Sequence, residues 1–286
     1  MKLVKSVLVA MLLGIMTIQV AWAYVDEYGV DYNLVEAAYK GDLKAVKYYI
    51  RKGANVNVAV GFAYRYGAKT TPLMAVVVSN SIVESKKEII EYLISKGADV
   101  NVSAYGDTAL HLAITSREKE MVELLIDKGA DVNAGEDSYG RNTLHIALDE
   151  GMIKIAKLLV DNGADVNAEA NSHNRAYGGH FKDITPFRTA VIRNNIEITK
   201  YLIDKSADVN ARSSDGLTPL LFVLYCCGNK SNSLELVKYL VNKGADVNAK
   251  NNKGRSVVDI ADTVDRNDAI FEFLLSSGAK CDDCNE

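Results

Sequence analysis

The chain has 286 residues, of which 48% are hydrophobic and 24% are charged, and its formal net charge is −4. A chain of this length and composition can bury a large core; a compact chain of this size buries roughly 70–75% of its surface. The moderately acidic balance argues against binding to a nucleic acid backbone, which relies on clustered Lys and Arg. Beyond the first residues, charges interrupt every apolar stretch, so no bilayer-spanning segment is expected there.

The first 23 residues read as a signal peptide. Lys2 and Lys5 precede an uncharged run from Ser6 to Val20, and Ala21-Trp22-Ala23 then supplies small residues at the −3 and −1 positions of a cleavage site. Cleavage after Ala23 would leave Tyr24 as the mature N-terminus and change the net charge from −4 to −6; an uncleaved anchor is the alternative. The chain is therefore expected to be exported, either to a bacterial periplasm or to the outside, and to keep no membrane span after cleavage.

After a short lead, residues 24–30, apolar stretches with helical spacing recur along the chain. Met121, Val122, Leu125 and Ile126 can share one face of such a helix, and Gly129 is predicted to end it, because glycine tolerates the left-handed conformation of a helix C-terminus. The same ending recurs six times: Gly53 to Asn57, Gly97 to Asn101, Gly129 to Asn133, Gly163 to Asn167, Ser206 to Asn210 and Gly244 to Asn248, with a partial copy at Gly278 to Lys280. Ser206 replaces the glycine once, and that junction is predicted to be weaker.

A second motif lies about 20 residues before each of these endings, within a repeating unit of about 33 residues. It is clearest as Gly106 to Ala113 and Gly140 to Ala147, and it predicts the start of another helix. A residue with a side-chain oxygen that can cap free N–H groups occupies the equivalent place in each copy: Thr71, Thr108, Asn142, Thr185, Thr218 and Ser256. Pro72, Pro186 and Pro219 follow directly, at a position where a helix accepts proline.

Two motifs recurring in fixed order and phase resemble the ankyrin repeat family over residues 31 to 280. The resemblance implies an all-α ankyrin-repeat solenoid of about seven helix-turn-helix repeats with projecting hairpin-like loops, each repeat burying the apolar face of its neighbours. The repeats are expected at about 31–57, 58–101, 102–134, 135–168, 169–211, 212–249 and 250–280. The first is polar, with Tyr32, Asn33, Glu36, Lys40, Asp42 and Lys44, and a polar tail, residues 281–286, follows the last, as end repeats that face water require.

No residue pattern indicates an enzyme, a cofactor or a metal site. His111 and His145 fall on the histidine of the second motif, where the resemblance implies a structural hydrogen bond to a neighbouring loop. His173 and His180, with Asp183 nearby, lie in an added segment but match no usual metal-ligand spacing. No phosphate loop, serine elbow or zinc-protease helix is present.

Cys281 and Cys284 have the spacing of a redox or zinc half-site, but no second ligand pair accompanies them. In an oxidising compartment a local Cys281–Cys284 disulfide is expected, with free or intermolecular thiols as the alternative. A bridge to Cys226 or Cys227 is not expected, because it would have to span most of a helix.

Partner-binding residues are expected in two places. Residues that the repeat does not need lengthen the loops of the second and fifth repeats, and they include aromatics beside cations: Phe62, Tyr64, Arg65, Tyr66, Arg175, Tyr177 and Phe181. The alternative is that these loops pack on their own stack. The concave surface that the resemblance implies would be lined by Tyr105, Asp107, Arg141, Leu217, Thr115, Ser116, Asp149, Glu150, Arg193 and Tyr225.

Two further additions are predicted in loops between helices, Ser79 to Lys87 and Gly228 to Ser233. The sequence therefore favours an exported, monomeric protein that binds another protein noncovalently through its concave surface and long loops. A structural or protective accessory of a cell-envelope enzyme, or an effector delivered into a host cell, are the alternatives.

Overall fold

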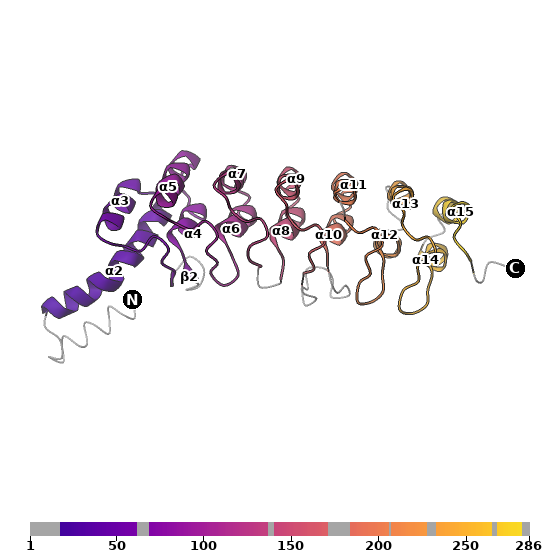
Figure 1. Ribbon diagram of the computed structural model, residues 1–286, viewed down its shortest axis with the longest axis horizontal. Coiled ribbons are helices and arrows are strands. Elements are labelled where there is room, and N and C mark those ends of the chain that lie inside the picture. Colours follow the sequence, from indigo (N-terminus) through magenta and orange to yellow (C-terminus); the bar gives the residue numbers. More distant parts are fainter. Residues whose placement is uncertain are drawn as a thin grey trace. The chain divides into compact units, whose positions relative to one another are not determined.

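The computed structural model describes residues 18–61, 69–136, 140–170, 184–205, 207–227, 233–264 and 268–281. This part of the chain holds fourteen helices and one short antiparallel sheet of two strands. The chain divides into two compact units, unit 1 from residue 1 to 135 and unit 2 from residue 136 to 286. The all-α fold expected from the sequence is confirmed, and Figure 1 shows the helices in chain order.

Unit 1 consists of three helix pairs and the short sheet: α2 (Ile18–Lys40) with α3 (Leu43–Arg51), α4 (Pro72–Val77) with α5 (Val83–Ser95), and α6 (Ala109–Thr115) with α7 (Lys119–Asp127). The first helices α2, α4 and α6 pack in series, and so do the second helices α3, α5 and α7. Strands β1 (Val60–Gly61) and β2 (Lys69–Thr70) pair where the second repeat carries its long loop. Helix α2 begins before the predicted boundary at residue 31 and runs through the predicted lead.

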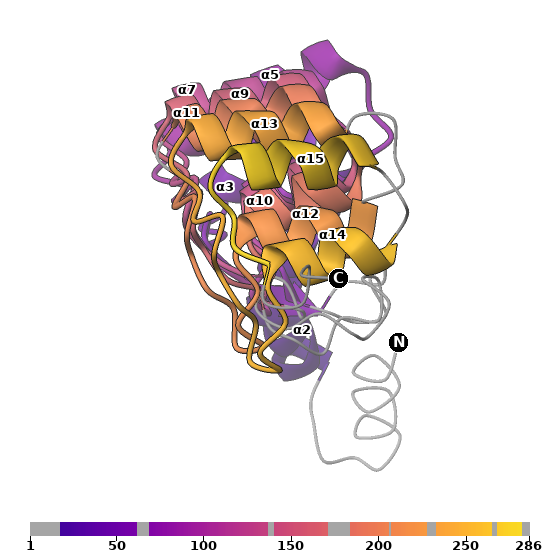
Figure 2. The ribbon, with the colours of Figure 1, turned by 90° about the vertical axis from the view of Figure 1, so that its right-hand side faces the viewer.

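Unit 2 consists of four helix pairs: α8 (Thr143–Asp149) with α9 (Ile153–Asp161), α10 (Pro186–Ile192) with α11 (Ile196–Asp204), α12 (Pro219–Cys227) with α13 (Ser233–Asn242), and α14 (Val257–Val264) with α15 (Asp268–Ser276). Figure 2 shows α9, α11, α13 and α15 as one layer above the layer that contains α10, α12 and α14. The core of this unit lies between the layers and includes Phe222, Leu240 and Leu274.

The predicted helix caps are confirmed. The Thr71 hydroxyl oxygen accepts a hydrogen bond from the backbone N–H of Met74 at 3.2 Å, and the side-chain oxygen of Asn142 accepts one from His145 at 3.0 Å. The same bond occurs at each remaining cap, Thr108, Thr185, Thr218 and Ser256. Because a cap of this kind contributes about 1 kcal/mol, the six together fix where α4, α6, α8, α10, α12 and α14 begin.

The predicted glycine endings are confirmed as well. Gly129 has a φ of 87°, and its counterparts Gly53, Gly97, Gly163, Gly244 and Gly278 have φ values between 88° and 92°. The asparagine that closes each motif links consecutive repeats. Asn101, for example, donates from Nδ2 to the carbonyl of Gly129 at 3.4 Å, and its Oδ1 accepts from the N–H of Asp131 at 2.8 Å. Asn57, Asn210 and Asn248 make the same two bonds to the repeat that follows each of them.

The predicted loop addition at Ser79 to Lys87 is only partly a loop. Residues 83–86 extend α5, which has 13 residues where α7 has 9. Lys86 explains the extension: its side chain is 2% exposed, and Nζ donates to the Val77 carbonyl at 3.1 Å and to Glu118 Oε1 at 2.9 Å. The added helical turn therefore carries an ammonium group that joins the ends of α4 and α7.

Leu217 is a second correction. It was expected on the concave surface, but it is 4% exposed and belongs to the core of unit 2, because an apolar side chain at this hairpin position folds inward against Phe222 and its neighbours. Among the described helices, none combines the length and the apolar character of a membrane span.

Candidate partner-binding face

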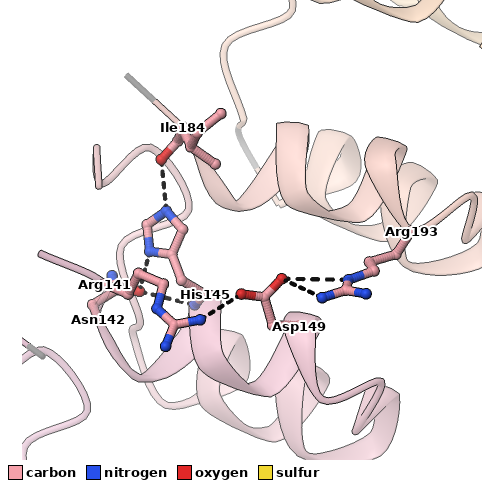
Figure 3. Close-up of polar contacts among 6 residues, drawn as sticks. All are labelled: Arg141, Asn142, His145, Asp149, Ile184 and Arg193. Carbon is pink, nitrogen blue, oxygen red and sulfur yellow. Dashed lines mark hydrogen bonds and ion pairs between the residues drawn. The ribbon is translucent and has the colours of Figure 1, made fainter. Parts of the chain in front are cut away.

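Three of the predicted partner-binding residues form one cluster in unit 2. Arg141 precedes the cap of α8, Asp149 is the last residue of α8, and Arg193 follows the last residue of α10. Arg141 Nη1 lies 2.7 Å from Asp149 Oδ2, and Arg193 Nη2 lies 3.2 Å from Asp149 Oδ1. Figure 3 shows the carboxylate between the two guanidinium groups.

Burial differs sharply within this arginine cluster (Arg141, Asp149 and Arg193). The side chain of Asp149 is 5% exposed, that of Arg141 is 19% exposed and that of Arg193 is 50% exposed. Both guanidinium groups share the one carboxylate, and of the two cations Arg193 is the more accessible to solvent. Hydrogen bonds to a carboxylate fix the orientation of a guanidinium group. Asp149 therefore positions the two arginines, which remain the groups that a partner can contact.

His145 fixes the helix that carries Asp149. Its side chain is fully buried, and its Nε2 lies 2.8 Å from the Ile184 carbonyl in the next hairpin while its Nδ1 lies 2.7 Å from Asn142 Oδ1 (Figure 3). Of the two histidines for which the sequence predicted a structural hydrogen bond to a neighbouring loop, His145 confirms it. In the next repeat Arg188 takes the equivalent place and donates from Nη2 to the Leu217 carbonyl at 3.2 Å.

The other predicted residues of this face are exposed to different degrees. Tyr225 in α12 is 42% exposed, and Glu150 is half-buried at the end of α8. In unit 1, Tyr105 is 72% exposed with a φ of 56°, in the two-residue turn that the Ala104–Asp107 bridge closes, and Asp107 is half-buried. Tyrosine is uncommon in this left-handed conformation, so the turn holds an aromatic ring in solvent at some cost in backbone energy.

The predicted long-loop residues Phe62, Tyr64, Arg65, Tyr66, Arg175, Tyr177 and Phe181 lie outside the described residues, as do His173, His180 and Asp183. Of the predicted cysteine pair, Cys281 is disulfide-bonded, and Cys284 lies outside the described residues.

No group of three or more His, Cys, Asp or Glu side chains within the described residues is arranged to hold a metal ion. A cavity of about 30 Å³ beside Arg188 and Arg212 is far smaller than the roughly 300–1,000 Å³ of a small-molecule site.

Sequence reasoning missed a ladder of side chains on the second helices of unit 2. Tyr201 donates from its hydroxyl to Asp161 Oδ1 at 2.6 Å, and Lys205 Nζ lies 2.7 Å from the same oxygen. Lys157 Nζ lies 5.2 Å from the Tyr201 ring centroid, and Lys205 Nζ lies 5.5 Å from it. The ring therefore contacts one cation from the preceding repeat and one from its own repeat.

The same arrangement recurs one repeat later with Asp204, Tyr239 and Lys243. The hydrogen bond between Lys205 and Asp161 lowers the pKa of the Asp161 carboxyl group and raises the pKa of the Lys205 ammonium group. A sequence signal existed: Tyr-x-x-x-Lys recurs directly before the glycine-type ending, at Tyr48, Tyr92, Tyr201 and Tyr239.

A family model described as ankyrin repeats (3 copies) matches residues 34–136, 86–170, 168–251 and 190–285. The chain belongs to the ankyrin repeat family. The crystal structure of the human ASB11 ankyrin repeat domain is similar to this ankyrin repeat protein, with a TM-score of 0.55 and 23% identity over 87% of this chain and 98% of that chain. That likeness shows the fold. No curated protein matches the chain. Ankyrin repeats are modules for protein–protein interaction, typically without enzymatic activity.

Proposed function

We propose that this ankyrin repeat protein binds another protein noncovalently, through the surface where its hairpins meet the ends of its first helices. In unit 2 this first-helix face carries Arg141, Asp149, Arg193 and Tyr225. The arginine cluster is the observation that carries the proposal. A carboxylate that is almost fully buried holds two guanidinium groups in place, and one of them is half-exposed.

A comparison of the repeats within the chain supports this assignment. The position directly before the helix cap differs among the repeats: Thr70, Asp107, Arg141, Ile184, Leu217 and Arg255. The cap itself is always a residue with a side-chain oxygen. Thr70, Ile184 and Leu217 are buried at this position, so it serves the core in some repeats. Helix formation does not require the ion-paired arginine that occupies it in the fourth repeat.

The exposed groups on this face also suit a protein partner. Tyr and Arg are enriched in binding hot spots, because they combine a large contact area with hydrogen bonding. Tyr225 and Arg193 are both at least 42% exposed at the ends of neighbouring first helices. The partner and its sequence are open, and the long loops of the second and fifth repeats remain candidate contacts by composition alone.

Charge reversal tests the proposal. A partner captured by crosslinking to the full mature chain would be purified, and its affinity for the wild type, Arg193→Glu and Lys154→Glu would be compared. Lys154 is an exposed cation on α9, so Lys154→Glu matches the change in charge on the other helix layer. We expect Arg193→Glu to weaken binding at least about tenfold and Lys154→Glu less than about twofold. Equal losses would show that only net charge matters and would contradict the proposal.

We also propose that the protein acts after export, in a periplasm or outside the cell. The support is the basic start, uncharged run and Ala21-Trp22-Ala23 site of the sequence. Mass spectrometry of the protein from envelope and culture-medium fractions should find a chain that begins at Tyr24, whereas a chain that retains residues 1–23 would contradict cleavage. Detection outside the producing cell would favour an effector, and loss of an envelope enzyme upon deletion would favour an accessory.

A further inference from the structure

In the side-chain ladder of unit 2, each tyrosine that lies between two lysines is accompanied by a carboxylate. In both of its steps a carboxylate from the preceding repeat receives the lysine that follows the tyrosine, as Asp161 does at Lys205 and Asp204 at Lys243. Two more ion pairs, Lys157 with Glu197 and Lys200 with Glu235, neutralise the lysines on the other side of the rings, each at 2.6 Å. Every lysine at these steps of unit 2 therefore has a carboxylate partner.

Unit 1 contains the same ladder without its carboxylate. Lys47 Nζ stands 5.3 Å from the centroid of the Tyr92 ring and Lys96 Nζ stands 5.5 Å from it, which repeats the geometry around Tyr201. Asp161 and Asp204 lie two residues before the glycine-type ending of the repeat that precedes the tyrosine. In the repeat that precedes Tyr92, this position is Arg51. The Tyr92 hydroxyl makes no hydrogen bond to any described residue. A cation thus occupies the place of the anion that the ladder needs.

The result is an exposed patch of cations and aromatic rings on α3 and α5. Tyr48 is 48% exposed, and Lys52 Nζ stands 5.6 Å from its ring centroid. We call the patch the α3–α5 patch; it comprises Tyr48, Tyr92, Lys44, Lys47, Arg51, Lys52 and Lys96. All five cations are exposed, and within the described parts of the chain none of them lies within ion-pair distance of a carboxylate.

The nearby acidic residues do not neutralise the cations of the patch. The carboxylate of Asp42 caps α3 by accepting from the N–H of Ala45 at 3.0 Å, and Glu91 lies 3.3 Å from Lys128. Glu84 and Glu88 lie in the first half of α5, and neither forms an ion pair with a described residue. Glu88 stands where Glu197 and Glu235 stand in unit 2, yet it does not pair with Lys47. The positive charge along α3 and at the C-terminal end of α5 therefore remains without a carboxylate partner among the described residues.

We propose that the α3–α5 patch docks an acidic segment of a partner protein, and that a partner carboxylate binds between the Tyr92 hydroxyl and Lys96, as Asp161 binds between Tyr201 and Lys205. The chain's own ladder identifies a carboxylate as the ligand for this arrangement, and charge complementarity with unpaired lysines favours it further. This surface lies on the second helices of unit 1, so the inference goes beyond the binding proposed for the first-helix face of unit 2.

Exchanging the residues that distinguish the two ladders tests the proposal directly. The full chain would be titrated at low ionic strength against a fluorescein-labelled oligoglutamate peptide, with an oligoglutamine peptide of equal length as control. Arg51→Asp supplies the missing carboxylate internally and should weaken oligoglutamate binding at least about tenfold. Lys253→Asp, the same change in charge at an exposed hairpin residue, should weaken it less than about twofold.

Asp161→Arg is the reciprocal variant: it opens the equivalent place in unit 2 and should add a second class of peptide sites. Circular dichroism would verify that each variant folds. Equal losses for Arg51→Asp and Lys253→Asp, or no oligoglutamate binding by the wild type, would overturn the proposal. Binding to phosphatidylglycerol vesicles without binding to the peptide would also overturn it, in favour of a lipid surface.

Discussion

Two residues of α8 in unit 2 have different roles. His145 is fully buried, and both of its ring nitrogens lie within hydrogen-bond distance of an oxygen, so it fixes the helix start and the next hairpin. Asp149, one helical turn further, orients Arg141 and Arg193. The first residue serves the fold and the second serves the surface, although the two belong to the same short helix.

His145→Ala should destabilise the protein by about 1–3 kcal/mol, because the buried Ile184 carbonyl loses its hydrogen-bond donor, and the missing ring adds the cost of a cavity. Urea unfolding followed by circular dichroism measures the change. Lys154→Ala, at an exposed position, should cost less than about 0.5 kcal/mol. A variant as stable as the wild type would show that this bond is not needed.

The ladder predicts a dependence of stability on pH. The pKa of Asp161 is lowered in the folded protein by the hydrogen bond from Lys205, so its contribution is present above the unfolded pKa of about 3.9 and is lost as the pH falls through the lower, folded value. The pKa of Lys205 is raised, so that contribution is lost as the pH rises above about 10.4. Between these limits Asp161→Asn should melt at a lower temperature than the wild type. This difference in melting temperature should disappear at pH values below the first limit and above the second. A difference that is constant with pH would contradict this account.

At the scale of elements, α5 differs from the other second helices because it is longer and carries a buried lysine. Its extra turn brings Lys86 to the ends of α4 and α7, where the ammonium group satisfies a helix C-terminal carbonyl and pairs with Glu118. The four methylene groups of the same side chain fill the space that the turn encloses.

Lys86→Met should therefore cost about 1 kcal/mol, since it keeps most of the packing and loses the polar contacts, whereas Lys86→Ala should cost roughly 2–4 kcal/mol. The comparison of their urea midpoints separates packing from charge. If the two variants lose the same stability, the polar contacts that both of them lack, rather than the packing, hold α5.

The sequence predicted the elements well because their signals are local. Caps such as Thr71 and glycine endings such as Gly129 act within a few residues, so a repeating pattern is enough to place them. The pairs that shape the surface join residues that are distant along the chain, such as Asp149 with Arg193 or Asp161 with Lys205. Which of these side chains meet depends on how neighbouring repeats are offset, and no local pattern reports that. Leu217 was misplaced for the same reason, since its burial depends on the repeat beside it.

At the scale of the whole molecule, each repeat presents two surfaces with different chemistry. The first-helix face of unit 2 bears oriented arginines and Tyr225, which fits the binding of a partner. The lysines beside Tyr201 and Tyr239 in unit 2 are neutralised by carboxylates, and Lys47 and Lys96 beside Tyr92 in unit 1 have no carboxylate within ion-pair distance among the described residues. A protein whose charges are paired in one place and unpaired in another is expected to bind where they are unpaired or held exposed.

Site-specific crosslinking in the producing cells tests the central claim most directly. A photoreactive amino acid would replace Tyr225 on the first-helix face or Lys238 on the second-helix layer of the same unit. We predict one crosslinked protein from position 225, its loss when Arg193→Glu is added, and little or none from position 238. Equal crosslinking from both positions, or crosslinking only from position 238, would contradict binding through the first-helix face.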